Sequence, residues 1–199
     1  MDNFPVRNML IAGTGAIGCA LLPAWVVWLK QLQVRVQVVL SRGAERFVTL
    51  ESLSALTGRT AVGESNLERF IGRSLHVELA EWAEVMVVAP ATANTIAKLA
   101  NGIADNFLCT VVLNSSRPVV VAPSLSGAAV GKPVVRRNLE RLALDGYGVV
   151  PTFPGAQVGD GKVTPGGMAD APTVFEFTRR FLVAGDNRLA HGQVEQDAV

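Results

Sequence analysis

The residues best suited to chemistry lie on either side of one apolar segment near the middle of the chain. His76 precedes that segment, and an imidazole that titrates near neutrality can accept or donate a proton at physiological pH. Residues 91–95 follow it and read Ala-Thr-Ala-Asn-Thr, so backbone amides and side-chain donors there can closely approach a flat ring or a phosphate. His191, the only other histidine, lies in a polar segment and is expected to be inert. The pattern indicates a proton-transfer group near a cofactor pocket.

The segment between these groups must be a buried strand that presents the pocket. Residues 85–89 form a short apolar run without polar alternation, as expected of a parallel strand covered on both faces, and Pro90 should end it. A helix should start near Thr95, with Thr92 or Asn94 as its N-cap. A strand, a tight polar turn and a helix N-terminus together form an anion and cofactor pocket at the carboxyl edge of an open sheet. That geometry alone suits many nucleotides.

The rest of the chain alternates between strand and helix patterns. Further strands are expected at residues 8–12, 34–40, 118–122 and 148–150. Helices are expected at residues 16–32 with a kink at Pro23, 44–56, 105–113, 134–144 and 172–183. This alternation predicts a single α/β domain over residues 1–185, built on a doubly wound parallel sheet of the flavodoxin or Rossmann type.

Two segments do not follow the alternation. Residues 154–167 are rich in glycine and proline, so we expect a flexible loop without regular structure. Residues 186–199 are polar, and we expect a frayed C-terminal tail.

The composition favours an oligomer. Only 18% of the residues are charged and the mean hydropathy is +0.32, which suggests that surface is buried between identical subunits. The net charge of +1 gives no reason to expect nucleic acid binding. Cys19 and Cys109 lack the spacing of a metal site, so we predict two buried free thiols and no bound metal.

One long apolar run imitates a membrane span, because residues 9–29 contain no charged side chain. Gly13, Gly15 and Gly18 divide this run into a short strand, a turn and a helix, and a glycine-rich turn does not suit lipid. We therefore expect no contact with a membrane and a cytoplasmic protein.

The same glycines raise the question of a dinucleotide cofactor. Residues 13–18 read Gly-Thr-Gly-Ala-Ile-Gly between a predicted strand and a predicted helix, which is the G-x-G-x-x-G fingerprint. That fingerprint also requires an acidic residue at the end of the second strand to bind the ribose of NAD. Residues 40–42 read Leu-Ser-Arg instead, so NAD is disfavoured, whereas Arg42 leaves NADP open.

The stretch from His76 to Asp105, with Ala-Pro-Ala-Thr-Ala-Asn-Thr at residues 89–95, resembles the core motif of the homo-oligomeric flavin-containing cysteine decarboxylases. The resemblance implies that FMN is the cofactor and that His76 is the catalytic base, which takes the proton of a cysteine thiol. It also implies that the turn at residues 13–18 and Ser41 hold the FMN phosphate. The implied FMN contacts are Gly13, Thr14, Gly15, Ala16, Ile17, Ser41, Phe47, Pro90, Ala91, Thr92, Ala93, Asn94, Thr95, Asp105 and Ser124. The implied substrate contacts are Asn101, Ser126 and Met168.

Two departures from the family pattern concern the substrate. The phosphopantothenoylcysteine and lantibiotic members of the family carry an asparagine for the substrate carboxylate where this chain has Ser126, which can still donate one hydrogen bond. Members that act in coenzyme A synthesis carry a reducing cysteine in the loop that corresponds to residues 154–167, and this chain has none there. The reaction should therefore stop at the oxidised enethiol.

The resemblance thus implies FMN-dependent oxidative decarboxylation of the C-terminal cysteine of a ribosomally made precursor peptide. The product would be a peptidyl aminoenethiol for an aminovinyl-cysteine ring, as in cypemycin, thioviridamide and lantibiotic pathways. The loop at residues 154–167 would fold over the peptide. The family's assembly implies a homo-oligomer, a trimer that can build a dodecamer, often with FMN at a subunit boundary.

Three alternatives stay open. A phosphopantothenoylcysteine decarboxylase of coenzyme A biosynthesis would have to work without the asparagine and the cysteine. A flavin prenyltransferase shares the fold, but we find no matching set of basic residues for a prenyl phosphate around the loop. A non-catalytic flavin-binding regulatory subunit agrees with the missing asparagine and disagrees with His76. Decarboxylation of a peptide that ends in cysteine would separate the last alternative from the enzymes.

Overall fold

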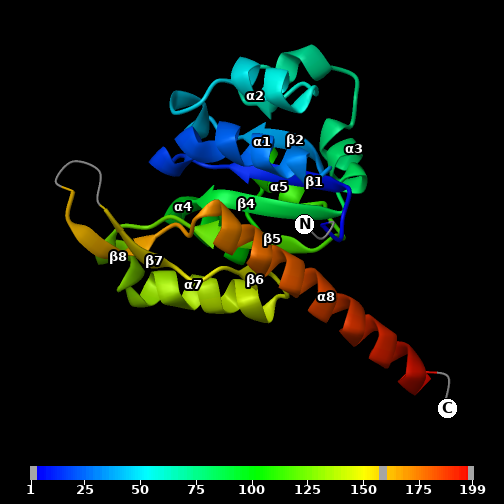
Figure 1. Ribbon diagram of the computed structural model, residues 1–199, viewed down its shortest axis with the longest axis vertical. Coiled ribbons are helices and arrows are strands. Elements are labelled where there is room, and N and C mark those ends of the chain that lie inside the picture. The colour runs from blue at the N-terminus through cyan, green and yellow to red at the C-terminus, as the bar shows by residue number, and fades with distance from the viewer. Residues whose placement is uncertain (1–3, 157–160, 197–199) are drawn as a thin grey trace.

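A six-stranded parallel sheet forms the centre of the computed structural model, which describes residues 4–156 and 161–196 (Figure 1). Its strands are β1 (Asn8–Gly13), β2 (Arg35–Leu40), β3 (Val62–Gly63), β4 (Val85–Ala91), β5 (Val119–Pro123) and β6 (Gly148–Val149). They lie in the order β3-β2-β1-β4-β5-β6, so the chain moves outward from β1 to β3 and returns beside β1 as β4. Open α/β sheets bind ligands at such a reversal, beyond the carboxyl ends of the strands. The doubly wound fold predicted from the sequence is confirmed.

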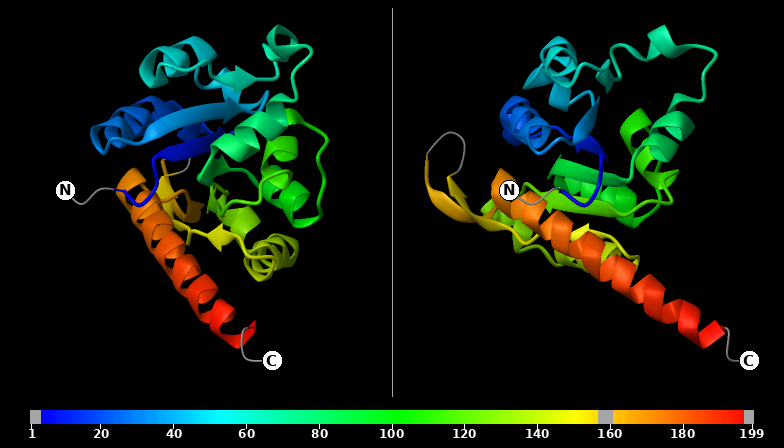
Figure 2. Two further views of the ribbon diagram at one scale, coloured as in Figure 1. Left: turned by 90° about the vertical axis from the view of Figure 1, so that its right-hand side faces the viewer. Right: turned by 45° about the vertical axis from the view of Figure 1, so that its right-hand side comes forward.

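Helices cover both faces of the sheet (Figure 2). α1 (Leu22–Gln31), α2 (Leu50–Thr57) and α8 (Ala171–Gln196) pack on one face, where the ring of Phe175 is fully buried. The other face carries α3 (Leu75–Trp82), α4 (Ala93–Ala100), α5 (Phe107–Leu113) and α7 (Pro133–Leu144). Along β1 the side chains alternate between the two cores, with Met9 in one and Leu10 in the other. Because both cores are apolar, a central strand needs no polar positions.

Several boundaries differ from those predicted. β4 continues through Pro90 to Ala91, and its pairing with β5 shifts register between Val88 and Ala91. Proline lacks the N–H that a strand ladder uses, so the ladder is interrupted there although the strand continues. Pro23 does not kink a long helix, because residues before it form the separate 3-10 helix η1 (Ile17–Leu21) and Pro23 lies in the first turn of α1.

The C-terminal helix and several short elements were also misjudged. α8 begins at Ala171 and continues to Gln196, so the backbone is helical where we expected the closing helix to end at residue 183 and a frayed tail to follow. The helix expected at 44–56 is divided into the 3-10 helix η2 (Ala44–Arg46) and α2. β3, the 3-10 helix η3 (Leu67–Phe70) and α6 (Gly127–Val130) were not predicted. Within the described part of the chain, no helix is long and apolar enough to cross a membrane.

The segment expected to lack regular structure contains an antiparallel pair, β7 (Phe153–Ala156) and β8 (Val163–Gly167), so that prediction was wrong. Its glycines allow two backbones to pack closely, because a Cβ on Gly167 would lie 2.9 Å from the Cα of Gly155. Gly155 and Gly167 therefore serve a tight contact between the two strands. The expected flexibility of residues 157–160 lies outside the described residues.

Candidate functional site

A cavity of about 890 Å³ opens beside the reversal of strand order. It lies among the turn after β1, the end of β2, the turn after β4 and the helices α4 and α5. Its lining residues are Gly15, Ser41, Arg42, Gly43, Glu45, Glu64, Ser65, Thr92, Asn94, Thr95, Lys98, Asn106 and Leu108. The sequence-predicted FMN contacts among them are Gly15, Ser41, Thr92, Asn94 and Thr95, so the structure brings together the two turns that we expected to form the pocket.

The turns after β1 and β2 meet at two glycines. A Cβ on Gly15 would lie 3.2 Å from the Cα of Gly43, so a side chain there would push the two backbones apart. Ser41 is fixed beside them, because its N–H donates to the carbonyl of Gly13 at 3.0 Å and its hydroxyl accepts from the N–H of Ala44 at 3.4 Å. This cradle of backbone and hydroxyl groups is typical of a phosphate site.

Thr14 joins the turn after β1 to the turn after β4. Its side chain is fully buried, its hydroxyl donates to the carbonyl of Pro90 at 2.7 Å, and the same oxygen accepts from the N–H of Thr92 at 2.9 Å. Thr14 was predicted to contact FMN, but it does not line the cavity. Its hydroxyl instead sets the position of the residues that do.

The turn after β4 leads directly into α4. Thr92 is the N-cap, and its hydroxyl oxygen accepts from the N–H of Thr95 at 3.4 Å, so Thr92 and not Asn94 caps the helix. The hydroxyls of Thr92 and Thr95 lie 3.2 Å apart. α4 begins at Ala93, two positions before the start expected from the sequence. Thr92, Asn94 and Thr95 all line the cavity from this end of the helix.

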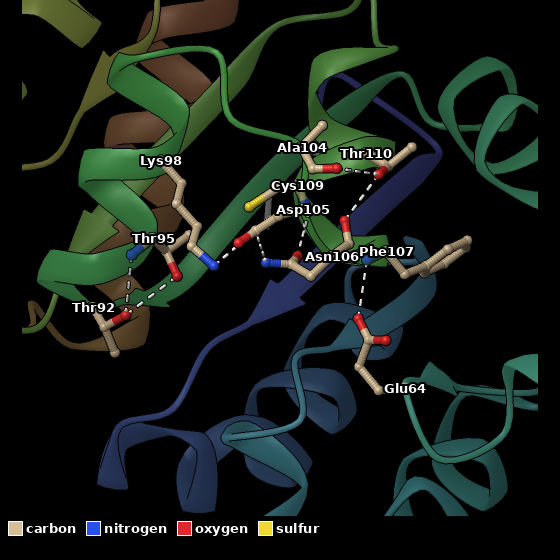
Figure 3. Close-up of polar contacts among 10 residues, drawn as sticks. All are labelled: Glu64, Thr92, Thr95, Lys98, Ala104, Asp105, Asn106, Phe107, Cys109 and Thr110. Atoms are coloured by element: carbon tan, nitrogen blue, oxygen red, sulfur yellow. Dashed lines mark hydrogen bonds and ion pairs between the residues drawn. The ribbon is translucent and has the colours of Figure 1, made fainter.

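A polar network connects α4 to α5 (Figure 3). The ammonium of Lys98 lies 2.7 Å from Asp105 Oδ1, and the amide of Asn106 donates to the same oxygen at 3.1 Å. The hydrogen bond from Lys98 lowers the pKa of the Asp105 carboxyl. Glu64, which follows β3, accepts the N–H of Phe107 at 2.9 Å and so ties the start of α5 to the β3 side of the cavity.

Sequence reasoning missed eight lining residues: Arg42, Gly43, Glu45, Glu64, Ser65, Lys98, Asn106 and Leu108. A signal existed for Lys98, because it follows Asn94 by four positions and therefore shares its helix face. Arg42 and Gly43 directly follow the predicted contact Ser41. Glu64 comes from a polar stretch with no pattern that would have placed it here.

The remaining predicted FMN contacts do not line the cavity. They are Gly13, Thr14, Ala16, Ile17, Phe47, Pro90, Ala91, Ala93, Asp105 and Ser124. Gly13 belongs to the core, because a Cβ there would lie 2.8 Å from Leu40 Cδ2. Ile17 and Phe47 are 50% and 39% exposed, so their side chains leave apolar surface on this molecule. Their predicted roles stay predictions.

His76 lies in the first turn of α3 and is half-buried. It does not line the cavity, although α3 packs against α5, whose first turn does. The cavity of a single subunit therefore does not by itself place His76 beside a bound ligand.

The predicted substrate contacts lie in two places. Ser126 is exposed and caps α6, where its hydroxyl oxygen accepts from the N–H of Ala129 at 3.2 Å and its O–H can still donate to a ligand. Met168 follows β8 and lies near the turn after β1, because a Cβ on Gly18 would come within 2.9 Å of Met168 Cε. Asn101 ends α4, and its amide donates to the carbonyl of Ala97 at 2.7 Å.

The β7–β8 hairpin is held against the segment that carries Ser126. The N–H of Leu125 donates to the carbonyl of Gly166 at 2.8 Å. A Cβ on Gly127 would lie 2.9 Å from the Cβ of Thr164, so β8 and the start of α6 are in close contact. The hairpin and the exposed hydroxyl of Ser126 are thus parts of one surface.

Both cysteines are free and buried, as predicted. Burial raises the pKa of Cys19 to about 11, and its thiol donates to the carbonyl of Thr14 at 3.0 Å. Burial also raises the pKa of Cys109. Neither thiol lies in the hairpin, so neither is available as a reactive group there.

Comparison with known sequences places these features in context. Residues 2–183 match the family model described as Flavoprotein. The coenzyme A biosynthesis bifunctional protein CoaBC of Bacillus subtilis (strain 168) is 37% identical over 141 residues, which are 71% of this chain and 35% of that protein. CoaBC of Vibrio cholerae is 32% identical over 206 residues, covering 96% of this chain and 50% of that protein. The chain spans half or less of the length of these relatives.

Solved structures give a second set of relatives. The FMN-dependent cysteine decarboxylase TvaF from thioviridamide biosynthesis is 35% identical with a TM-score of 0.69, covering 72% of this chain and 88% of that one. The FMN-dependent cysteine decarboxylase SpaF is 31% identical with a TM-score of 0.72, covering 88% and 98%. The peptidyl-cysteine decarboxylase EpiD is 25% identical with a TM-score of 0.73, covering 85% and 97%.

Proposed function

The chain belongs to the Flavoprotein family and to its homo-oligomeric flavin-containing cysteine decarboxylases, and we propose that it oxidatively decarboxylates the C-terminal cysteine of a ribosomally made peptide. Its cofactor is FMN, as in the decarboxylases to which it is similar. The product is a peptidyl aminoenethiol that serves to form an aminovinyl-cysteine ring.

The residues around the cavity fit FMN. A volume of about 890 Å³ lies within the range of about 300–1,000 Å³ usual for cofactor pockets. The cradle at Gly15, Ser41 and Gly43 would hold the phosphate, and the turn at Thr92 to Thr95 would contact the rest of the cofactor. Bound FMN would supply the acceptor for a hydride from the substrate.

The chain's own groups would handle the proton and the carboxylate. His76 would take the proton of the cysteine thiol, so that the sulfur can form a double bond to carbon as the β-carbon gives up its hydride. Carbon dioxide then leaves, because the new thiocarbonyl accepts the electron pair of the breaking bond. The O–H of Ser126 would hold the carboxylate before it leaves.

The position of His76 adds a requirement. Because His76 does not line the cavity of its own chain, the proposal needs assembly to bring it to the cavity of a neighbouring subunit. A homo-oligomer with FMN at a subunit boundary, as the family resemblance implies, meets this need. We propose a trimer, which can build a dodecamer, in the cytoplasm.

One observation carries the choice of an oxidised product: the hairpin contains no cysteine, and the chain's two thiols are buried elsewhere. Without a thiol there, the hairpin cannot reduce the enethiol to a saturated thiol. A phosphopantothenoylcysteine decarboxylase is the second candidate, because CoaBC proteins are among the sequence relatives.

Mass spectrometry would test the proposal directly. The yellow protein is mixed with short peptides that end in cysteine and, in parallel, with phosphopantothenoylcysteine. We expect peptides lighter by the elements of formic acid, which are carbon dioxide and two hydrogens. Turnover of phosphopantothenoylcysteine alone would favour the second candidate, and no turnover of either would favour a regulatory flavoprotein.

Variants would test the role of His76. We expect His76→Asn to bind FMN and to be inactive, and His191→Asn, the matched control, to be active. Mixing His76→Asn with an inactive Gly15→Val protein, under conditions that exchange subunits, should restore part of the activity if His76 acts on a neighbour's cavity. Full activity of His76→Asn alone would contradict its assignment as the base.

A further inference from the structure

The cationic side chains of Arg42 and Lys98 line the cavity, and Lys98 lies apart from the phosphate cradle. Arg42 is the cation that lies with the turns after β1 and β2, whereas Lys98 lines the cavity from α4. The side chain of Lys98 is 21% exposed, so most of it is removed from water. Lys98 shares a helix face with Asn94 and Thr95, the residues after β4 that line the same cavity. We therefore expect Lys98 to lie near the flavin ring and not near the phosphate of bound FMN.

The ammonium of Lys98 is held in a fixed position but is not fully neutralised. Asp105 contacts it at 2.7 Å, yet the carboxylate of Asp105 is 54% exposed, also accepts from Asn106, and does not line the cavity. The lining carboxylates Glu45 and Glu64 each accept a backbone N–H instead, from other segments. Figure 3 shows Lys98 reaching from α4 toward the start of α5, with Asp105 beyond its ammonium.

We propose that Lys98 stabilises the reduced form of the bound cofactor and so raises the reduction potential of FMN. The inference rests on the proposed use of FMN but not on the identity of the substrate. Gain of a hydride adds one negative charge to the flavin ring, and a fixed cation attracts that charge more strongly inside a cavity than in water. Asp105 tunes the effect, because it holds the ammonium in place while offsetting part of its charge.

The test is a reductive titration of the purified flavoprotein against a reference dye, which measures the midpoint potential without any substrate. We expect Lys98→Gln to reduce the preference for reduced over oxidised FMN at least about tenfold, which is about 30 mV for a two-electron couple. Asp105→Asn should shift the potential the opposite way, and Lys98→Arg should restore it. Lys132→Gln, an exposed charge away from the cavity, is the matched control and should leave it unchanged.

Riboflavin, which has the same ring without the phosphate, separates the two positions that Lys98 could occupy. If Lys98 acts on the ring, Lys98→Gln also lowers the potential of bound riboflavin. If the variant weakens binding of FMN but not of riboflavin, and both potentials stay at their wild-type values, Lys98 is a phosphate ligand and the inference is wrong. An unchanged potential in Asp105→Asn would overturn it as well, even if Lys98→Gln failed to fold. A wild-type protein that binds no flavin would overturn both this inference and the proposed function.

Discussion

Replacing Thr14 with valine should destabilise the protein, because valine keeps the shape of threonine but lacks its hydroxyl. That hydroxyl is fully buried, donates to the carbonyl of Pro90 at 2.7 Å and accepts from the N–H of Thr92 at 2.9 Å. In the valine variant the carbonyl of Pro90 still accepts a second hydrogen bond, from the N–H of Thr14 at 3.1 Å. Because this carbonyl is not left without a donor, the loss of the hydroxyl should cost only about 1 kcal/mol there. The N–H of Thr92 would lose its partner, at about 1–3 kcal/mol. The free energy of unfolding should fall by about 2–4 kcal/mol.

Urea unfolding of the flavin-free protein would measure this change as a lower midpoint with an unchanged slope. Thr14→Ser is the matched control, because it keeps the hydroxyl and loses one buried methyl group, at about 1 kcal/mol. Valine should therefore be clearly less stable than serine at this position. If the valine and serine variants were equally stable, the hydroxyl of Thr14 would not hold the turns after β1 and β4 together, and the role assigned to Thr14 would be wrong.

Three further predictions follow from the fold and its charges. Gly166→Ala should free the hairpin and cost about 1–3 kcal/mol, because φ is +103° and the new Cβ would lie 2.8 Å from the carbonyl oxygen of Leu125. Gly161→Ala shares the positive φ, at +68°, but its Cβ meets open space, so limited proteolysis should cut the Gly166 variant faster. Cys19 and Cys109 should resist alkylation at pH 8 in the folded protein, because burial covers both thiols and raises their pKa values. Both should react in urea, and mass spectrometry would count the alkyl groups added to each state. Rapid labelling of the folded protein would contradict their burial. The pKa of Asp105 in the folded protein lies below its unfolded value of about 3.9. The ion pair of Asp105 therefore stabilises the fold above about pH 3.9, and this stabilisation is lost as the pH falls through the folded-state pKa. Acid unfolding of Lys98→Gln, which lacks the partner of Asp105, should not show this loss of stability.

Most of the sheet, and the turn after β4 that carries Thr92, Asn94 and Thr95, could be predicted because they follow from local rules. An uninterrupted apolar run specifies β4, and the polar residues before the next helix limit its N-cap to Thr92 or Asn94, of which the structure has Thr92. The rest of the cavity depends on contacts between distant segments. Glu64 meets the N–H of Phe107 from 43 positions away, and Gly43 meets Gly15 across two turns. No periodicity in the sequence encodes such meetings, so Glu64 could not be assigned to the site beforehand.

The hairpin shows how one residue type supports opposite conclusions. Counted along the chain, the glycines of residues 154–167 indicate freedom, because each one removes a side chain that could restrict the backbone. In space, three of these glycines lie in close contacts, since Gly155 meets Gly167 and the carbonyl of Gly166 accepts the N–H of Leu125. β8 is therefore held at a fixed position beside Ser126. If the proposed peptide substrate binds there, it meets a preformed surface, and less of its binding free energy goes into ordering the protein.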